Sequence, residues 1–185
     1  MPSSGTCTIN MDMQHVIFTP TLTHSSMFYS RQLSNFNLFI HNGDTNTSFM
    51  CLWHEGMAGR GGNEVASCLL QVIPSNLTPK RNLTVWCDNC ADQNKNRTVL
   101  MIMFYAVAKN ILDCIEFKFL ASGHSYMPRD RDFGIIEKRK RVCKPMVSEE
   151  IVEMIKEARQ RCDDERRRFL RYFYLMRYIF KYVAD

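Results

Sequence analysis

Residues 83–96 read LTVWCDNCADQNKN, an apolar run that ends at Asp88 and a polar stretch that follows it. The run 83–87 is too apolar for the edge of a sheet and predicts a buried, central strand. A carboxylate that follows such a strand and precedes a helix lies where open α/β sheets bind their ligands. The stretch therefore predicts an α/β fold and a candidate functional site at Asp88.

Three further strands are expected before this stretch. Residues 8–13 and 36–41 have the β-branched and apolar content of strands. The sequence Asn-Gly-Asp at 42–44 is a strong hairpin signal that leads into a strand at 48–54. The first half of the chain therefore predicts an antiparallel start to the sheet.

Helices are expected between the later strands. Apolar residues recur at helical spacing over 63–73, with Asn63 as the N-cap, and again over 96–112. Residues 115–120 predict a fifth strand, and Asp132 is expected to cap a third helix that begins at the next residue. The predicted order is β-β-β-α-β-α-β-α, a mixed five-stranded sheet.

The C-terminal residues differ in composition from the rest. Ser148 followed by two glutamates predicts the start of a helix, which is expected to run almost to the end of the chain. The aromatic stripe at 169–183 is interpreted as a packing surface, and the region is rich in arginine. We therefore expect two units, a domain over 8–145 and a basic, aromatic-rich helical extension over 146–185.

Composition limits the class of protein. The 185 residues are 45% hydrophobic, which suits one ordinary domain, and the net charge is +5. Basic residues gather at 138–141 and in the C-terminal third, a distribution that attracts polyanions, although a solvated helix face gives the same pattern. We find neither a signal segment nor the ~18 apolar residues of a membrane span. A soluble, intracellular chain is expected, without a membrane partner.

The eight cysteines are expected to be reduced and mostly buried. Only Cys87 and Cys90 have the spacing of a metal-binding pair, and no second close pair completes a four-ligand zinc site. The sequence therefore does not predict zinc.

Acidic residues at three places could form one site with oxygen ligands. Asp12 lies among apolar residues, where a buried carboxylate needs a partner, and Asp130 follows the fifth predicted strand. Together with Asp88 they would repel one another unless a cation neutralised them, and hard Mg²⁺ prefers such oxygen ligands. Asp132 competes with Asp130 for the third place, and Glu137 is a further rival.

The individual residues also have structural explanations. An aspartate after a strand, such as Asp88, often caps a helix rather than binding metal. His124 by itself is an ordinary loop histidine, and Glu137 suits a surface salt bridge. Only the combined order of the acids favours a metal site.

Four motifs carry a resemblance to a known family. They lie at 29–33 (YSRQL), 59–64 (GRGGNE), 88–96 (DNCADQNKN) and from 123–125 (GHS) through 132–134 (DFG). They resemble an uncharacterised transposon-derived family, common in invertebrate genomes, with a ribonuclease H-like fold and a suggested descent from DDE-type transposases. The resemblance covers roughly residues 10–140.

The resemblance implies specific roles for these residues. Asp12, Asp88 and Asp130 would bind Mg²⁺ or Mn²⁺, and Glu64 would match the extra acid of ribonuclease H enzymes. His124, in a loop before the third acid, would transfer a proton. Three residues of the polar stretch, Asn89, Gln93 and Asn94, would support the ligands or contact the backbone.

The implied activity is phosphodiester cleavage or strand transfer by in-line attack of water or a 3′-hydroxyl. The expected partner is nucleic acid, with DNA as the first candidate, and the expected location is the nucleus. Whether the chain is an enzyme stays open, because a domesticated, non-catalytic domain that binds nucleic acid or protein has the same pattern. A homo-oligomer formed through the C-terminal helix is a further hypothesis.

Overall fold

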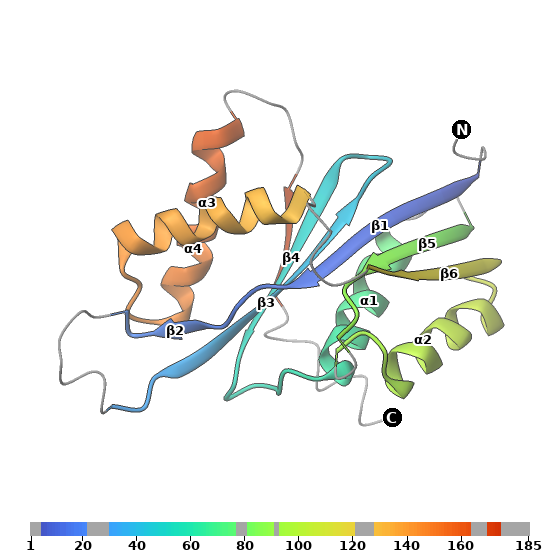
Figure 1. The fold of residues 1–185 in the computed structure, drawn as a ribbon, viewed down its shortest axis with the longest axis horizontal. Helices are drawn as coiled ribbons and strands as arrows, with labels where there is room; N and C mark the ends of the chain where they lie inside the picture. The colour runs from blue at the N-terminus through green and yellow to red at the C-terminus, as the bar shows by residue number, and fades with distance from the viewer. Residues whose placement is uncertain are drawn as a thin grey trace.

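A single mixed β-sheet forms the centre of the computed structural model (Figure 1). The structure describes residues 5–21, 30–76, 81–90, 93–120, 128–163 and 170–174. The strands lie in the order β6-β5-β1-β3-β4-β7, and β2 pairs with β3 beside β1. The strands are β1 (Thr6–Met13), β2 (Ile17–Thr19), β3 (Leu33–Asn42), β4 (Thr47–His54), β5 (Asn82–Cys87), β6 (Cys114–Phe119) and β7 (Leu170–Tyr174).

Strand directions follow from the pairing. β1, β5 and β6 are parallel neighbours, whereas β3 is antiparallel to β1, β2 and β4. β7 is parallel to β4. The carboxyl ends of β1, β5 and β6 therefore lie at one edge of the sheet, where α/β sheets bind ligands.

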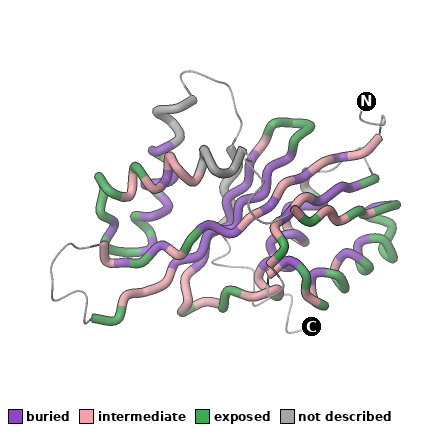
Figure 2. Tube along the Cα trace, viewed as in Figure 1, coloured by how far each residue is buried: buried purple, intermediate pink, exposed green. Residues whose placement is uncertain are grey.

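Two pairs of helices enclose the sheet and bury two cores. The helices are α1 (Gly62–Asn76), α2 (Arg97–Ala108), α3 (Pro128–Cys143) and α4 (Ser148–Asp163). Residues of α1 and α2 pack on one face with the odd-numbered residues of β1, and residues of α3 and α4 pack on the other with Phe39, Met50 and Leu52. Figure 2 shows β3 and β4 buried over most of their length, whereas β1 alternates between buried and intermediate residues. Each fully buried large side chain contributes about 1.5–3 kcal/mol.

Most of the predicted elements are confirmed. The strands at 8–13, 36–41, 48–54, 83–87 and 115–120 correspond to β1, β3, β4, β5 and β6, and β5 lies between two neighbours. The two strands on either side of the Asn-Gly-Asp turn form an antiparallel hairpin, in which Asn42 Oδ1 accepts hydrogen bonds from the amides of Asp44 and Thr45. The prediction of an α/β protein with a mixed sheet is therefore correct.

Other expectations were wrong in detail. The observed order, β-β-β-β-α-β-α-β-α-α-β, contains β2 and β7, which were not predicted. α3 begins at Pro128, so Asp132 lies inside that helix and does not cap it. α1 begins at Gly62, so Asn63 lies in its first turn.

The predicted C-terminal helix is also shorter than expected. α4 ends at Asp163, and Leu170–Tyr174 form a strand. This strand joins the edge of β4, so the extension is not wholly helical.

Among the described residues, no helix has the length and apolar character needed to cross a membrane.

Candidate functional site

Asp12 and Asp88 lie at the carboxyl ends of adjacent parallel strands. The register pairs Asn10 with Trp86, so two residues further along Asp12 is level with Asp88. Odd-numbered residues of β1 and β5 enter the core beneath α1 and α2, and side chains alternate along a strand. The even-numbered Asp12 therefore points to the other face, and both acids are half-buried.

The carboxylate of Asp88 is held by the loop that follows it. Its Oδ1 accepts a close hydrogen bond from Nδ2 of Asn94 and a second, 3.3 Å long, from the backbone amide of Cys90. Asn94 itself is buried. Because both donors address the same oxygen, the second carboxylate oxygen, Oδ2, can still serve a ligand.

α3 lies over the same face of the sheet as Asp12. The ring of its Phe133 meets the ring of Phe39 edge-on at 5.7 Å between centroids, and Phe39 is the cross-strand partner of Asp12. Further along α3, Oε1 of Glu137 accepts a hydrogen bond of 3.2 Å from Nε2 of Gln14. From Phe133 to Glu137, α3 therefore runs in the direction of β1, from the level of Asp12 to that of Gln14.

That first turn contains Asp130. The resemblance placed Asp130 before the last helix, but it lies within α3, and α4 follows. The side chains of Asp130 and Asp132 lie outside the described part of the structure, as does His124. Of these acids, the fold places Asp12 and Asp88 at the ends of neighbouring strands.

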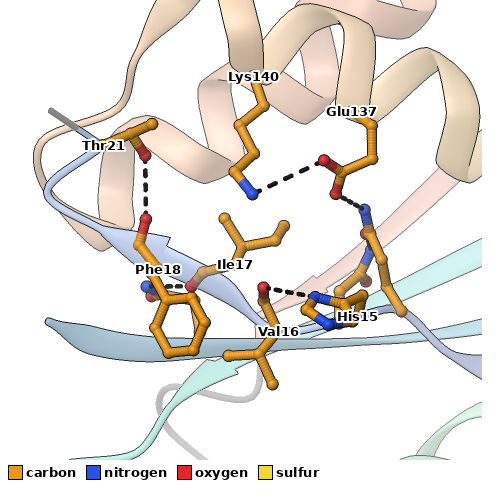
Figure 3. A network of polar contacts seen from close by, with 10 residues as sticks. His15, Val16, Ile17, Phe18, Thr21, Glu137 and Lys140 are labelled. Carbon is orange, nitrogen blue, oxygen red and sulfur yellow. Dashed lines mark hydrogen bonds and ion pairs between the residues drawn. The ribbon is translucent and has the colours of Figure 1, made fainter. Parts of the chain in front are cut away.

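A buried polar network connects the end of β1 to α3. Nδ2 of Asn37 donates to Oε1 of Gln14 at 2.8 Å, and Gln14 in turn donates to Glu137. Glu137 also lies 3.7 Å from Nζ of Lys140, and Figure 3 shows both α3 side chains reaching toward the segment of His15 and Ile17. This network was not predicted from the sequence. Its one sequence signal is Asn37, a polar residue between the apolar residues of a strand.

The network has a consequence for Glu137 as a rival metal ligand. Its carboxylate is used by Gln14 and Lys140, and it lies beyond Asp12 in the direction of β1. The surface ion pair expected for it is therefore present, with Lys140 as the partner.

The basic cluster at 138–141 is partly neutralised within the fold. Arg139 forms a close ion pair with Glu157 of α4, and this hydrogen bond raises the pKa of Arg139. Lys140 pairs with Glu137, whereas Lys138 and Arg141 are exposed. Two of the four cations therefore remain directed toward solvent.

Glu64 organises the glycine-rich loop before α1. Its Oε1 accepts a hydrogen bond of 3.0 Å from the amide of Gly59, and its Oε2 accepts one of 2.9 Å from the amide of Gly61. Nε1 of Trp53 donates to the carbonyl of Gly59 at 2.7 Å. Both oxygens of the acid that the resemblance implied as catalytic therefore have backbone partners.

The N-termini of α1 and α2 meet beside this loop. Asn96 caps α2, where its side chain accepts a hydrogen bond of 3.0 Å from the amide of Val99. A Cβ atom at Gly62 would lie 1.6 Å from Nδ2 of Asn96. Glycine at 62 is therefore required for this close approach of α1 to the cap of α2.

Among the side chains that the structure describes, no group of three or more His, Cys, Asp or Glu residues could hold a metal ion. Cys87 is buried and Cys90 half-buried, and the seven cysteines whose side chains the structure describes, all but Cys162, are free thiols. The expectation of reduced cysteines is confirmed for these residues, whereas Cys114 and Cys143 are exposed rather than buried.

Comparison with known proteins identifies the family. Residues 36–183 match the family model described as a domain of unknown function, DUF7869. Because the match spans most of the sequence, the chain belongs to the DUF7869 family. No curated protein matches the chain.

Proposed function

We propose that this DUF7869 domain is a transposase-derived, metal-dependent nuclease or strand-transfer domain that acts on the phosphodiesters of nucleic acid. The observation that carries the proposal is the level placement of Asp12 and Asp88 at the ends of two adjacent parallel strands. Two carboxylates so placed repel each other, and a divalent cation relieves that repulsion. If DNA is the substrate, the nucleus is the expected location.

The sheet supports a ribonuclease H-like fold for the domain. The strand that carries Asp12 has an antiparallel neighbour, β3, on one side and a parallel neighbour, β5, on the other. Five strands lie in the order β4-β3-β1-β5-β6, with helices between the later ones. These five strands support the proposed fold, and β2 and β7 are additional to the expected layout.

The donor set suits magnesium or manganese. Asp12 and Asp88 would supply carboxylate oxygens, and Asp130, on the helix whose Phe133 packs against Phe39, is the proposed third ligand. Small, hard cations bind such oxygen ligands in preference to nitrogen or sulfur. Bound there, the ion would supply the Lewis acid for phosphodiester attack, while Asn94 holds the carboxylate of Asp88 in place.

Nucleic acid would be held by the cations that the fold leaves exposed. Lys138 and Arg141 lie on α3, the helix that carries Asp130. Contacts from lysine and arginine to phosphates supply affinity without base specificity and weaken with salt. We therefore expect binding that depends strongly on ionic strength.

The test uses the full chain with labelled DNA, both duplex and single-stranded. In Mg²⁺ or Mn²⁺ the wild type should cleave or join strands and bind the ion by titration calorimetry. Asp12→Asn and Asp88→Asn should each abolish activity and weaken ion binding, whereas Glu153→Gln, at an exposed position of α4, should change neither. A folded wild type that does not process DNA, together with ion binding unchanged in Asp88→Asn, contradicts the proposal.

A second candidate is a domesticated domain that binds nucleic acid without cleaving it. It is favoured by the partners of the acids, because Asn94 and Cys90 engage Asp88, and two backbone amides engage Glu64. Under this alternative the double variant Asp12→Asn, Asp88→Asn retains salt-dependent DNA binding, and the wild type cleaves nothing. If the wild type cleaves DNA and the double variant does not, the alternative is ruled out.

A further inference from the structure

α2 is apolar on all sides, although only one side faces the core. Val99, Met103 and Ala106 are its buried residues, and they pack in the core shared with α1. From Thr98 to Ala108 the helix has no charged residue. A helix of this composition is normally covered on every side.

The outer side of α2 carries large apolar side chains that the described residues do not cover. The exposed fractions are 48% for Leu100, 60% for Met101, 72% for Phe104 and 50% for Tyr105. With ~200 Å² for each of these four large side chains, two of them aromatic, the exposed fractions give a patch of roughly 500 Å². We call these four residues the α2 patch.

We propose that the α2 patch is the contact surface between two copies of this chain, related by a two-fold axis near Phe104. In such a contact the same patch supplies both sides. Two patches of roughly 500 Å² bury about 1,000 Å² in total, before the surrounding residues are counted, which reaches the minimum for a biological interface and lies in the size range of weak ones. The inference does not depend on the proposed function.

The spacing of the patch suits the packing of two helices. Leu100 with Phe104, and Met101 with Tyr105, are pairs at four-residue separation, and such rows form the ridges that pack into the grooves of a second helix at about 50°. Within Thr98–Ala108 a self-contact buries no charged side chain. The ammonium of Lys109 lies 5.8 Å from the centre of the Tyr105 ring, at the border of the patch.

The charges at the ends of α2 are compatible with the same arrangement. Arg97 begins the helix and Lys109 caps its C-terminus, at roughly 10 Å and 8 Å along the axis from Phe104 at ~1.5 Å per residue. Helices that cross at Phe104 diverge toward their ends. The like charges of the two copies therefore stay apart, at the border of the interface, where salt screens them.

The experiment is to measure the mass of the full chain in solution across the micromolar range by light scattering and sedimentation. The wild type should be a dimer, and Phe104→Glu should be a folded monomer. Val142→Glu is the matched control, since Val142 on α3 is also 72% exposed, and it should remain a dimer. A monomeric wild type overturns the proposal, because another segment or a different partner would then cover α2. A Phe104→Glu variant that remains a dimer also overturns it.

A second variant keeps the test decisive if Phe104→Glu does not fold. Phe104→Cys places a thiol near the proposed axis, in a background where the exposed Cys114 and Cys143 are changed to serine. Mild oxidation should cross-link two chains through position 104. The same substitution at Val142 should give no cross-linked dimer, and equal cross-linking from both positions contradicts a specific contact at α2.

Discussion

The side-chain amide of Asn94 donates a hydrogen bond to the carboxylate of Asp88, and only 4% of Asn94 is exposed. The two residues lie in the same loop after β5, so the loop itself fixes the direction of the acid. The buried amide of Asn94 would have no water to replace this acceptor if it were lost.

Asn94→Ala should lower the free energy of unfolding by about 1–3 kcal/mol, because it removes a buried donor to a charged acceptor. Asn89→Ala, at an exposed position of the same loop, is the control and should change it by less than about 0.5 kcal/mol. Urea unfolding followed by circular dichroism measures both. Equal effects of the two substitutions would show that the contact with Asp88 does not stabilise the loop.

Gly62→Ala should destabilise the protein by about 1–3 kcal/mol, since its methyl group would overlap the side chain of Asn96 and displace the cap of α2. Gly134→Ala, within α3, is the matched control. Nothing lies within 4 Å of the Cβ position at Gly134, so alanine there should stabilise the helix by about 0.5–1 kcal/mol. Thermal unfolding should therefore shift in opposite directions for the two variants.

Glu64→Ala should cost about 1–2 kcal/mol of stability, because the amides of Gly59 and Gly61 both lose their acceptor. Glu64→Gln keeps one acceptor oxygen and should lose less. Chemical denaturation measures the difference, with the exposed Glu153→Ala as control. If Glu64→Ala unfolds like the wild type, the loop does not need the acid, and a role in chemistry gains weight.

Cys68 should make stability depend on pH in the alkaline range. Burial raises the pKa of this thiol above its ordinary value of 9.0, and a hydrogen bond with Cys51 adds to the increase. The unfolded chain therefore loses this proton at lower pH than the folded chain, so the contribution is fully present below pH 9.0 and is lost as pH rises above it.

The measurement compares urea unfolding of the wild type and Cys68→Ala on either side of that pH. The wild type should lose more stability than the variant as pH rises, whereas Cys114→Ala, at an exposed thiol, should follow the wild type. Parallel pH profiles for the wild type and Cys68→Ala would assign the alkaline loss of stability to other groups.

Much of the sheet could be predicted because its strands have strong local patterns. β1 alternates buried and half-buried residues, and β5 is an apolar run between polar ends. β2 has three residues, too few for a periodic signal. β7 was expected to be helical because its aromatic residues belong to the aromatic stripe at 169–183. Its pairing with β4 joins residues far apart in the sequence, which local sequence patterns do not encode.

Some features of the candidate site could also be predicted from the sequence, whereas others depend on tertiary packing. The placement of Asp12 and Asp88 at the ends of neighbouring strands could be expected, because the carboxyl ends of parallel strands share an edge of the sheet. The contact between Gln14 and Glu137 joins residues 123 positions apart and depends on how α3 settles on the sheet. Glu64 was assigned to chemistry by resemblance, whereas its role in the loop depends on the backbone conformation of Gly59–Gly61, which residue type alone does not specify.

The pairing of β7 with β4 has a consequence for biosynthesis. Ser48 pairs with Leu170, so most of the polypeptide is translated between the two partners. Until residues 170–174 leave the ribosome, the outer border of β4 presents unbonded amides and carbonyls that other nascent chains can join. Interrupted translation before residue 170 would therefore release products prone to aggregate, and chaperones would be needed most in that interval.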